Sequence, residues 1–73
     1  MTLIEFVRQL IKDNFDDIQV DFAERTGIDP TALSRWLNKR RHNHGYIALH
    51  LFCTYPGQWG TIIAAWIAEA RME

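Results

Sequence analysis

The sequence contains a single cysteine, Cys53, so it cannot form a disulfide bond within the chain. Small secreted domains commonly depend on such bonds, and a lone cysteine therefore favours a reducing compartment. The N-terminus has no basic stretch followed by an apolar run, so no secretory signal is expected. The longest apolar run, residues 62–68, is far shorter than the roughly 20 residues that cross a membrane. These features predict a cytoplasmic protein without a membrane partner.

Patterns typical of catalysis and of metal binding are also missing. There is no glycine-rich phosphate loop, and Ser34 has no base beside it in the sequence. Cys53 lies in an apolar context, which predicts an inert, buried thiol. His42, His44 and His50 do not have the spacing of a closed zinc site, and we assign His42 and His44 to phosphate contact or plain surface. The prediction is no enzymatic activity, no cofactor and no metal.

The net charge of -1 lacks the strong positive excess typical of nucleic-acid binding, but the charges are unevenly distributed. Residues 1–24 contain six acidic side chains and only two basic ones. Residues 35–44 contain no acid and six basic or histidine side chains: Arg35, Lys39, Arg40, Arg41, His42 and His44. The distribution predicts one basic side that can face a polyanion, with a solvated loop as the alternative. The acidic part is interpreted as solvated surface or, alternatively, as a protein-binding face.

Apolar periodicity predicts an all-α domain of four or five helices that occupies residues 1–73 as a single unit. The expected helices cover residues 2–14, about 17–26, 30–38, 46–53 and 58–71. Thr2 and Glu5 have capping-box spacing, and Asp16 or Asp17 is expected to cap the second helix. A core of this size supplies only about 3–5 kcal/mol, so a partner subunit would add useful stability.

Residues 19–38 have the pattern of a helix-turn-helix. Gly27 can turn the chain at positive φ, Asp29 can cap the next helix, and Pro30 suits its first position. Leu33 and Trp36 are expected to pack back against the preceding helix at Phe22 and Ala23. The outer face of the second helix of the motif then carries only small or polar side chains: Thr31, Ala32, Ser34, Arg35 and Asn38. Such a face suits a wet, polar groove.

This segment resembles the helix-turn-helix of the phage repressor and Cro family, and the resemblance implies a lambda-repressor-like fold. The residues that carry it are Gln19, Ala23, Gly27, Leu33 and Trp36. It implies a phage or bacterial regulator, most simply a repressor, that binds double-stranded DNA sequence-specifically as a homodimer. The chain departs from the family pattern at Ile18, where a polar cap is usual, and at the dipeptide Asp29-Pro30. These departures shift the expected base contacts toward Thr31 and Arg35.

The predicted interface divides into two sets of residues. Base contacts are assigned to Thr31, Ser34 and Arg35, because these side chains can meet base edges in the major groove. Phosphate contacts are assigned to Gln19, Asn38, Lys39, Arg40, Arg41 and His42. The alternative function is a protein-binding inhibitor or antirepressor that uses the helix-turn-helix only as a scaffold and has a regulatory protein as partner.

The C-terminal segment, residues 57–72, predicts a helix with a broad apolar face. That face is too apolar to be covered easily by so small a domain, so we predict that it forms a homodimer interface, with packing inside the chain as the alternative. The residues assigned to this interface are Trp59, Ile63, Trp66 and Ile67.

Overall fold

A computed structural model describes residues 1–39 and 43–72, and these residues form five α-helices without a strand. The elements are α1 (Leu3–Phe15), α2 (Gln19–Thr26), α3 (Pro30–Lys39), α4 (His44–Thr54), a short 3₁₀ turn η1 (Pro56–Gln58) and α5 (Trp59–Arg71). The predicted all-α domain of four or five helices is therefore confirmed. Within the described ranges, no helix is both long enough and apolar enough to cross a membrane.

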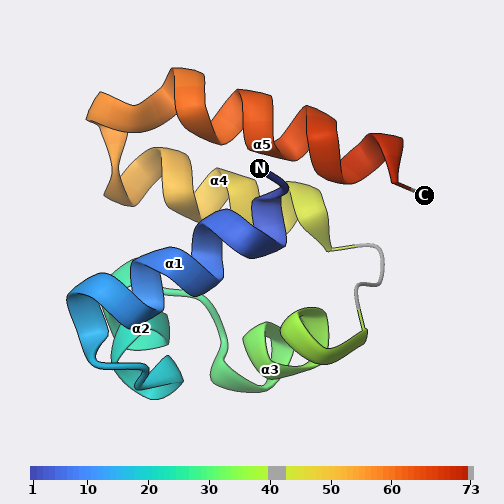
Figure 1. Ribbon diagram of the computed structural model, residues 1–73. Coiled ribbons are helices and arrows are strands. Elements are labelled where there is room, and N and C mark those ends of the chain that lie inside the picture. The colour runs from blue at the N-terminus through green and yellow to red at the C-terminus, as the bar shows by residue number, and fades with distance from the viewer. Residues whose placement is uncertain (40–42, 73) are drawn as a thin grey trace.

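The helices divide between two ends of the molecule (Figure 1). α4 and α5 pack against each other at one end, while α2 and α3 pack together at the other. α1 runs between the two pairs and contacts both α2 and α5. α3 and α5 therefore face opposite sides of the molecule, so a surface on one is separate from a surface on the other.

One apolar core joins the two ends. Phe22, Ala23, Leu33 and Trp36 all belong to it, as the spacing in the motif predicted. The remaining buried members come from α1, α4 and α5, from Leu37 of α3, and from Ile28 in the connection between α2 and α3. α3 is thus fixed to the domain through its apolar side, and its opposite side is left for solvent.

Several helix ends follow the local sequence as predicted. The Thr2 hydroxyl accepts a hydrogen bond from the Glu5 amide, and the Glu5 carboxylate accepts one from the Thr2 amide at 2.8 Å. Gly27 ends α2 with φ of 78°, in the left-handed region that glycine enters without a steric penalty. α3 begins at Pro30, and Asp29 Oδ2 caps it by accepting the Ala32 N–H at 2.9 Å.

The predicted cap of α2 is wrong. Asp16 and Asp17 do not cap that helix; both have positive φ and end α1 instead, with the Asp17 N–H donating to the Ile11 carbonyl. Aspartate enters the left-handed region more readily than most residues, which explains this role. The N-cap residue of α2 is Ile18, an apolar side chain that cannot accept a hydrogen bond.

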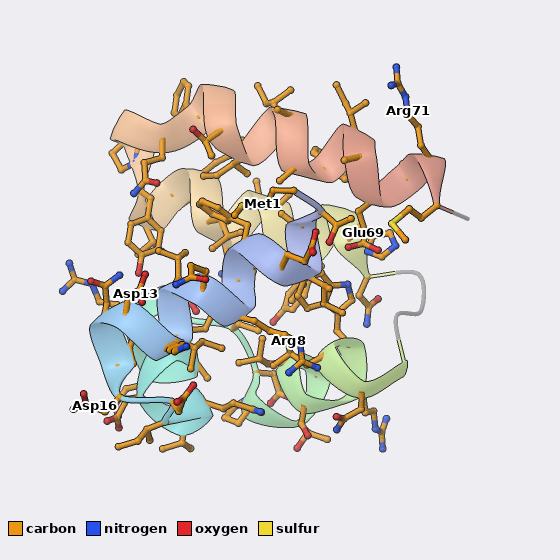
Figure 2. All side chains as sticks on the ribbon, viewed as in Figure 1. Met1, Arg8, Asp13, Asp16, Glu69 and Arg71 are labelled. Carbon is orange, nitrogen blue, oxygen red and sulfur yellow. The ribbon has the colours of Figure 1, made fainter. Side chains whose placement is uncertain are left out.

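A buried acid fixes the last turns of α5 to the start of α1. Glu69 is 1% exposed, and its Oε1 accepts the backbone N–H of Ile4 at 3.0 Å. Figure 2 shows this side chain between α5 and the beginning of α1, whereas Arg71 points away from the molecule. A carboxylate at this position meets the partial positive charge of the α1 N-terminus. The sequence pattern gave no indication of this contact.

Candidate nucleic-acid interface

The outer side of α3 is a continuous polar face. Thr31, Arg35 and Asn38 are exposed, and their spacing places them in one row along the helix. Ser34 is half-buried beside that row, and its hydroxyl accepts a hydrogen bond from the Asn38 amide at 3.5 Å. The large apolar side chains of this helix, Leu33, Trp36 and Leu37, are all buried. The structure thus brings the three predicted base-contacting residues together on one face.

Gln19, the predicted phosphate contact at the start of α2, is exposed. Its helix, α2, lies at the same end of the molecule as α3 (Figure 1). Lys39 is the last residue of α3, and its side chain is not among those described. Asn38, another predicted phosphate contact, is exposed on α3, and the remaining predicted phosphate contacts, Arg40, Arg41 and His42, lie outside the described residues.

The connection between α2 and α3 is short and held by hydrogen bonds. It consists of residues 27–29, of which Ile28 is buried at 2% exposure. The Ile28 N–H donates to the Thr26 hydroxyl, which itself donates to the Phe22 carbonyl. These contacts hold the turn between α2 and α3 together.

Two side chains of α4 hold the same connection from outside the motif. The Tyr46 hydroxyl accepts the Asp29 N–H at 3.1 Å, and His50 Nδ1 donates to the Thr26 carbonyl at 3.0 Å. The two rings pack edge to face with their centroids 4.7 Å apart. Sequence reasoning did not assign these roles. The available signal was the spacing of four residues between two aromatic rings, which places them on one helix face.

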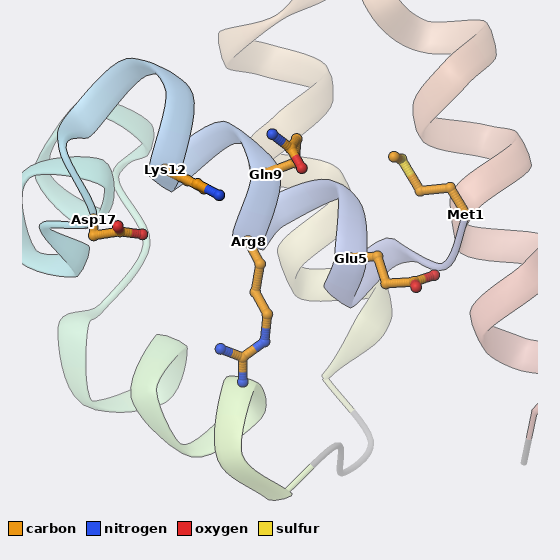
Figure 3. A pocket seen from close by; sticks show the side chains of 6 residues that line it. All are labelled: Met1, Glu5, Arg8, Gln9, Lys12 and Asp17. Carbon is orange, nitrogen blue, oxygen red and sulfur yellow. The ribbon is translucent and has the colours of Figure 1, made fainter.

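Arg8 holds the other end of α3. Its Nη2 donates to the Leu37 carbonyl at 2.9 Å. The same side chain lines an open pocket on the outer side of α1, together with Glu5, Gln9 and Lys12. Of the six side chains labelled in Figure 3, Arg8 is the one that reaches the last turn of α3. A guanidinium is favoured there because the carbonyl end of a helix carries partial negative charge.

The assignment of His44 to the surface or to phosphate is wrong. His44 is 7% exposed, and its Nδ1 accepts the indole N–H of Trp36 at 2.9 Å. An indole N–H can only donate, so this bond requires an Nδ1 atom that carries no proton. α4 begins at His44, two residues before the predicted start at Tyr46, and so directs the ring inward beside α3.

Cys53 also differs from the prediction, since its thiol is exposed. α4 buries Ile47, Ala48 and Leu51 and packs Phe52 against the core. Cys53 falls on the side that these contacts leave open. In the described part of the chain, no group of three or more His, Cys, Asp or Glu side chains is placed to hold a metal ion.

The outer face of α5 is apolar and partly open to solvent. Trp59, Ile63 and Ile67 are 54%, 46% and 50% exposed, and they follow one another at intervals of four residues. Beside them lies a shallow groove lined by Phe52, Ile63, Trp66, Ile67 and Ala70. Trp66 is half-buried: its ring lies 6.2 Å from that of Phe52, and a Cβ added at Gly45 of α4 would lie 3.5 Å from the Trp66 ring.

No family model matches the chain, and neither a curated protein nor a solved structure matches it.

Proposed function

We propose that the chain is a sequence-specific double-stranded DNA-binding regulator of transcription, in which α2 and α3 act as a helix-turn-helix and α3 enters the major groove. The observation that carries this proposal is the polar row of Thr31, Arg35 and Asn38 on a helix whose apolar side chains are buried. An α-helix fits the major groove, and an arginine can bond guanine O6 and N7 together. Repression in a phage or bacterial cytoplasm is the setting that the sequence resemblance suggests.

The phosphate contacts in this proposal come from both helices. Gln19 at the start of α2 and Asn38 at the end of α3 are polar, exposed side chains that can bond phosphate oxygens. The basic residues from Lys39 onward would add the salt-dependent part of the affinity. Asp29, an acid near the proposed interface, has one carboxylate oxygen engaged in capping α3.

The test begins with selection of bound duplexes from a random pool, followed by titration of the enriched site. Arg35→Ala is expected to weaken binding to that site by about 1–3 kcal/mol, or roughly 5- to 150-fold, and to relax the preference at one base pair. Arg35→Lys keeps the charge but loses the planar fork, so it should retain affinity for random DNA while losing specificity.

Arg71→Ala is the matched control. It removes the same side chain from an exposed position on α5, at the opposite end of the molecule from α3 (Figure 2). An equal loss in the two alanine variants would assign the effect to net charge rather than to base contact. If the wild-type chain enriches no site at low salt, the DNA proposal fails and a protein-binding inhibitor or antirepressor becomes the better interpretation. The exposed apolar face of α5 is the observation that favours this second function.

We also propose that α5 is the contact surface between two copies of the chain. Trp59, Ile63 and Ile67 form a ridge beside an apolar groove, so two identical faces can place ridge into groove around a two-fold axis. Residues 45–68 contain no Asp, Glu, Lys or Arg, so two copies of this face bring no like charges together. Such a dimer would leave both α3 helices on its outer sides.

Ile63→Glu is expected to convert a wild-type dimer into a monomer, because it places a charge in the centre of the proposed contact. Sedimentation equilibrium over a range of concentrations measures this change. Val20→Glu is the control, since Val20 is a β-branched residue on α2 that is 58% exposed. Trp66 is a poor choice for this test because its half-buried ring also supports the fold. A wild-type chain that stays monomeric at every concentration would contradict the dimer.

A further inference from the structure

α3 is held at both ends by side chains from outside the proposed helix-turn-helix. At its N-terminal end, Tyr46 of α4 accepts the Asp29 N–H at 3.1 Å. At its C-terminal end, Arg8 of α1 donates to the Leu37 carbonyl at 2.9 Å. The two bonds lie at opposite ends of a ten-residue helix, which is about 15 Å long. Two fixed points so far apart define the direction of a helix axis.

The buried side of α3 alone fixes that direction less tightly. Leu33 and Leu37 make apolar contacts on one side of the helix, and apolar packing is not directional. The bond from the Trp36 indole to His44 is directional, but it is a single point near the middle of the helix and does not by itself define an axis. The carbonyl at Leu37 and the N–H at Asp29, in contrast, accept partners only within a narrow range of distances and angles. A small rotation of α3 on its apolar contacts would therefore break one of the two bonds.

We propose that Arg8 and Tyr46 are positioning residues that together set the orientation in which α3 is presented to DNA. This inference rests on the proposed function, because the orientation of α3 affects recognition only if this helix contacts bases. Base contacts need side chains placed within a fraction of an ångström. Neither residue lies on the polar row of α3, and each acts through the helix that it holds.

The variants that test this role remove the two bonds and little else. Tyr46→Phe removes one oxygen atom and leaves the ring that packs on His50. Arg8→Gln removes the guanidinium while keeping a polar side chain on an exposed position. The matched control is the double variant Lys12→Gln with Tyr55→Phe, which makes the same loss of charge and hydroxyl at residues that do not belong to the two bonds. Arg8→Lys can still donate to the carbonyl and should restore much of the wild-type behaviour.

The first measurement is the orientation of α3 in the free protein, from residual dipolar couplings of its backbone amides. In Arg8→Gln/Tyr46→Phe, the couplings of α1, α4 and α5 are expected to fit the wild-type arrangement while those of α3 do not. The control double variant should fit throughout. If the α3 couplings still fit the wild-type orientation, the proposal is overturned, whatever the protein binds. Should the double variant fail to fold, Tyr46→Phe alone decides by the same criterion.

The second measurement is the ratio of affinity for the selected site to affinity for random DNA. Each lost hydrogen bond is expected to lower this ratio about 2- to 10-fold, while affinity for random DNA matches that of the control double variant. A purely structural role would lower both affinities together and leave the ratio unchanged, which would overturn the proposal. If the wild-type chain enriches no site, the proposed function fails, and the dipolar couplings still decide whether the pair orients α3.

Discussion

Trp36→Ala is expected to lower the free energy of unfolding by about 3–5 kcal/mol, which is close to the whole stability that a core of this size supplies. Trp36 is 1% exposed and is the largest of the fully buried side chains. Its removal leaves a cavity where α3 meets the core, and it takes the indole donor away from His44 Nδ1. Urea unfolding followed by far-UV circular dichroism would measure the loss, and much of the variant should already be unfolded without urea.

Trp36→Phe makes the N–H donor the larger part of the change, because it keeps a six-membered aromatic ring and removes the donor with only two ring carbons. We expect a loss of about 1–3 kcal/mol, since the imidazole atom that accepted the bond stays buried. Trp59→Phe is the matched control: its indole N–H also donates at 2.9 Å, to the Phe52 carbonyl, but Trp59 is 54% exposed and water can replace the donor. If the two phenylalanine variants lose the same free energy of unfolding, then burial does not increase the cost of removing the donor at Trp36, and this explanation is wrong.

The features that sequence reasoning placed correctly depend on neighbours within a few residues. The bonds between Thr2 and Glu5, and between Asp29 and Ala32, each join residues three positions apart. The turn at Gly27 depends on the conformation of one residue. Helix periodicity likewise needs only a window of about a dozen residues, so the number of helices and the polar outer face of α3 followed from the sequence.

The features that sequence reasoning missed are polar contacts between distant residues. Tyr46 is 17 residues from Asp29, Arg8 is 29 from Leu37, and Glu69 is 65 from Ile4. Each pair meets only after the helices have packed, so no local pattern marks it. The missed burial of His44 has a related cause, because the position of its ring depends on where α4 begins relative to α3.

The exposure of Cys53 shows a second reason why burial could not be predicted from the sequence. α4 is apolar around most of its circumference, with Ile47, Leu51 and Phe52 facing the core and Leu49 60% exposed. Periodicity assigns a buried face only when polar residues mark the opposite one. In α4 the choice of buried face is made by the contacts of this helix with α2 and α5, which the sequence pattern does not contain.

Glu69→Ala is expected to lower the free energy of unfolding by about 3 kcal/mol or more, because it removes a hydrogen bond to a charged group and leaves a buried donor. The donor is the Ile4 N–H, in the first turn of α1, where no preceding helical carbonyl can replace the carboxylate. Glu69→Gln keeps an oxygen acceptor but loses the charge that meets the helix dipole, so its loss should be smaller.

Amide hydrogen exchange gives the sharper measurement of the same contact. The Ile4 amide is expected to exchange faster in Glu69→Ala, relative to the amides of α2 and α3, because the link between α5 and the start of α1 is gone. Glu24→Ala is the control, since Glu24 is an exposed acid on α2 and its loss should change stability by less than about 0.5 kcal/mol. An Ile4 amide that stays as protected as in the wild type would contradict the role of Glu69. The acid would then be a tolerated buried charge rather than the group that fixes α5 to α1.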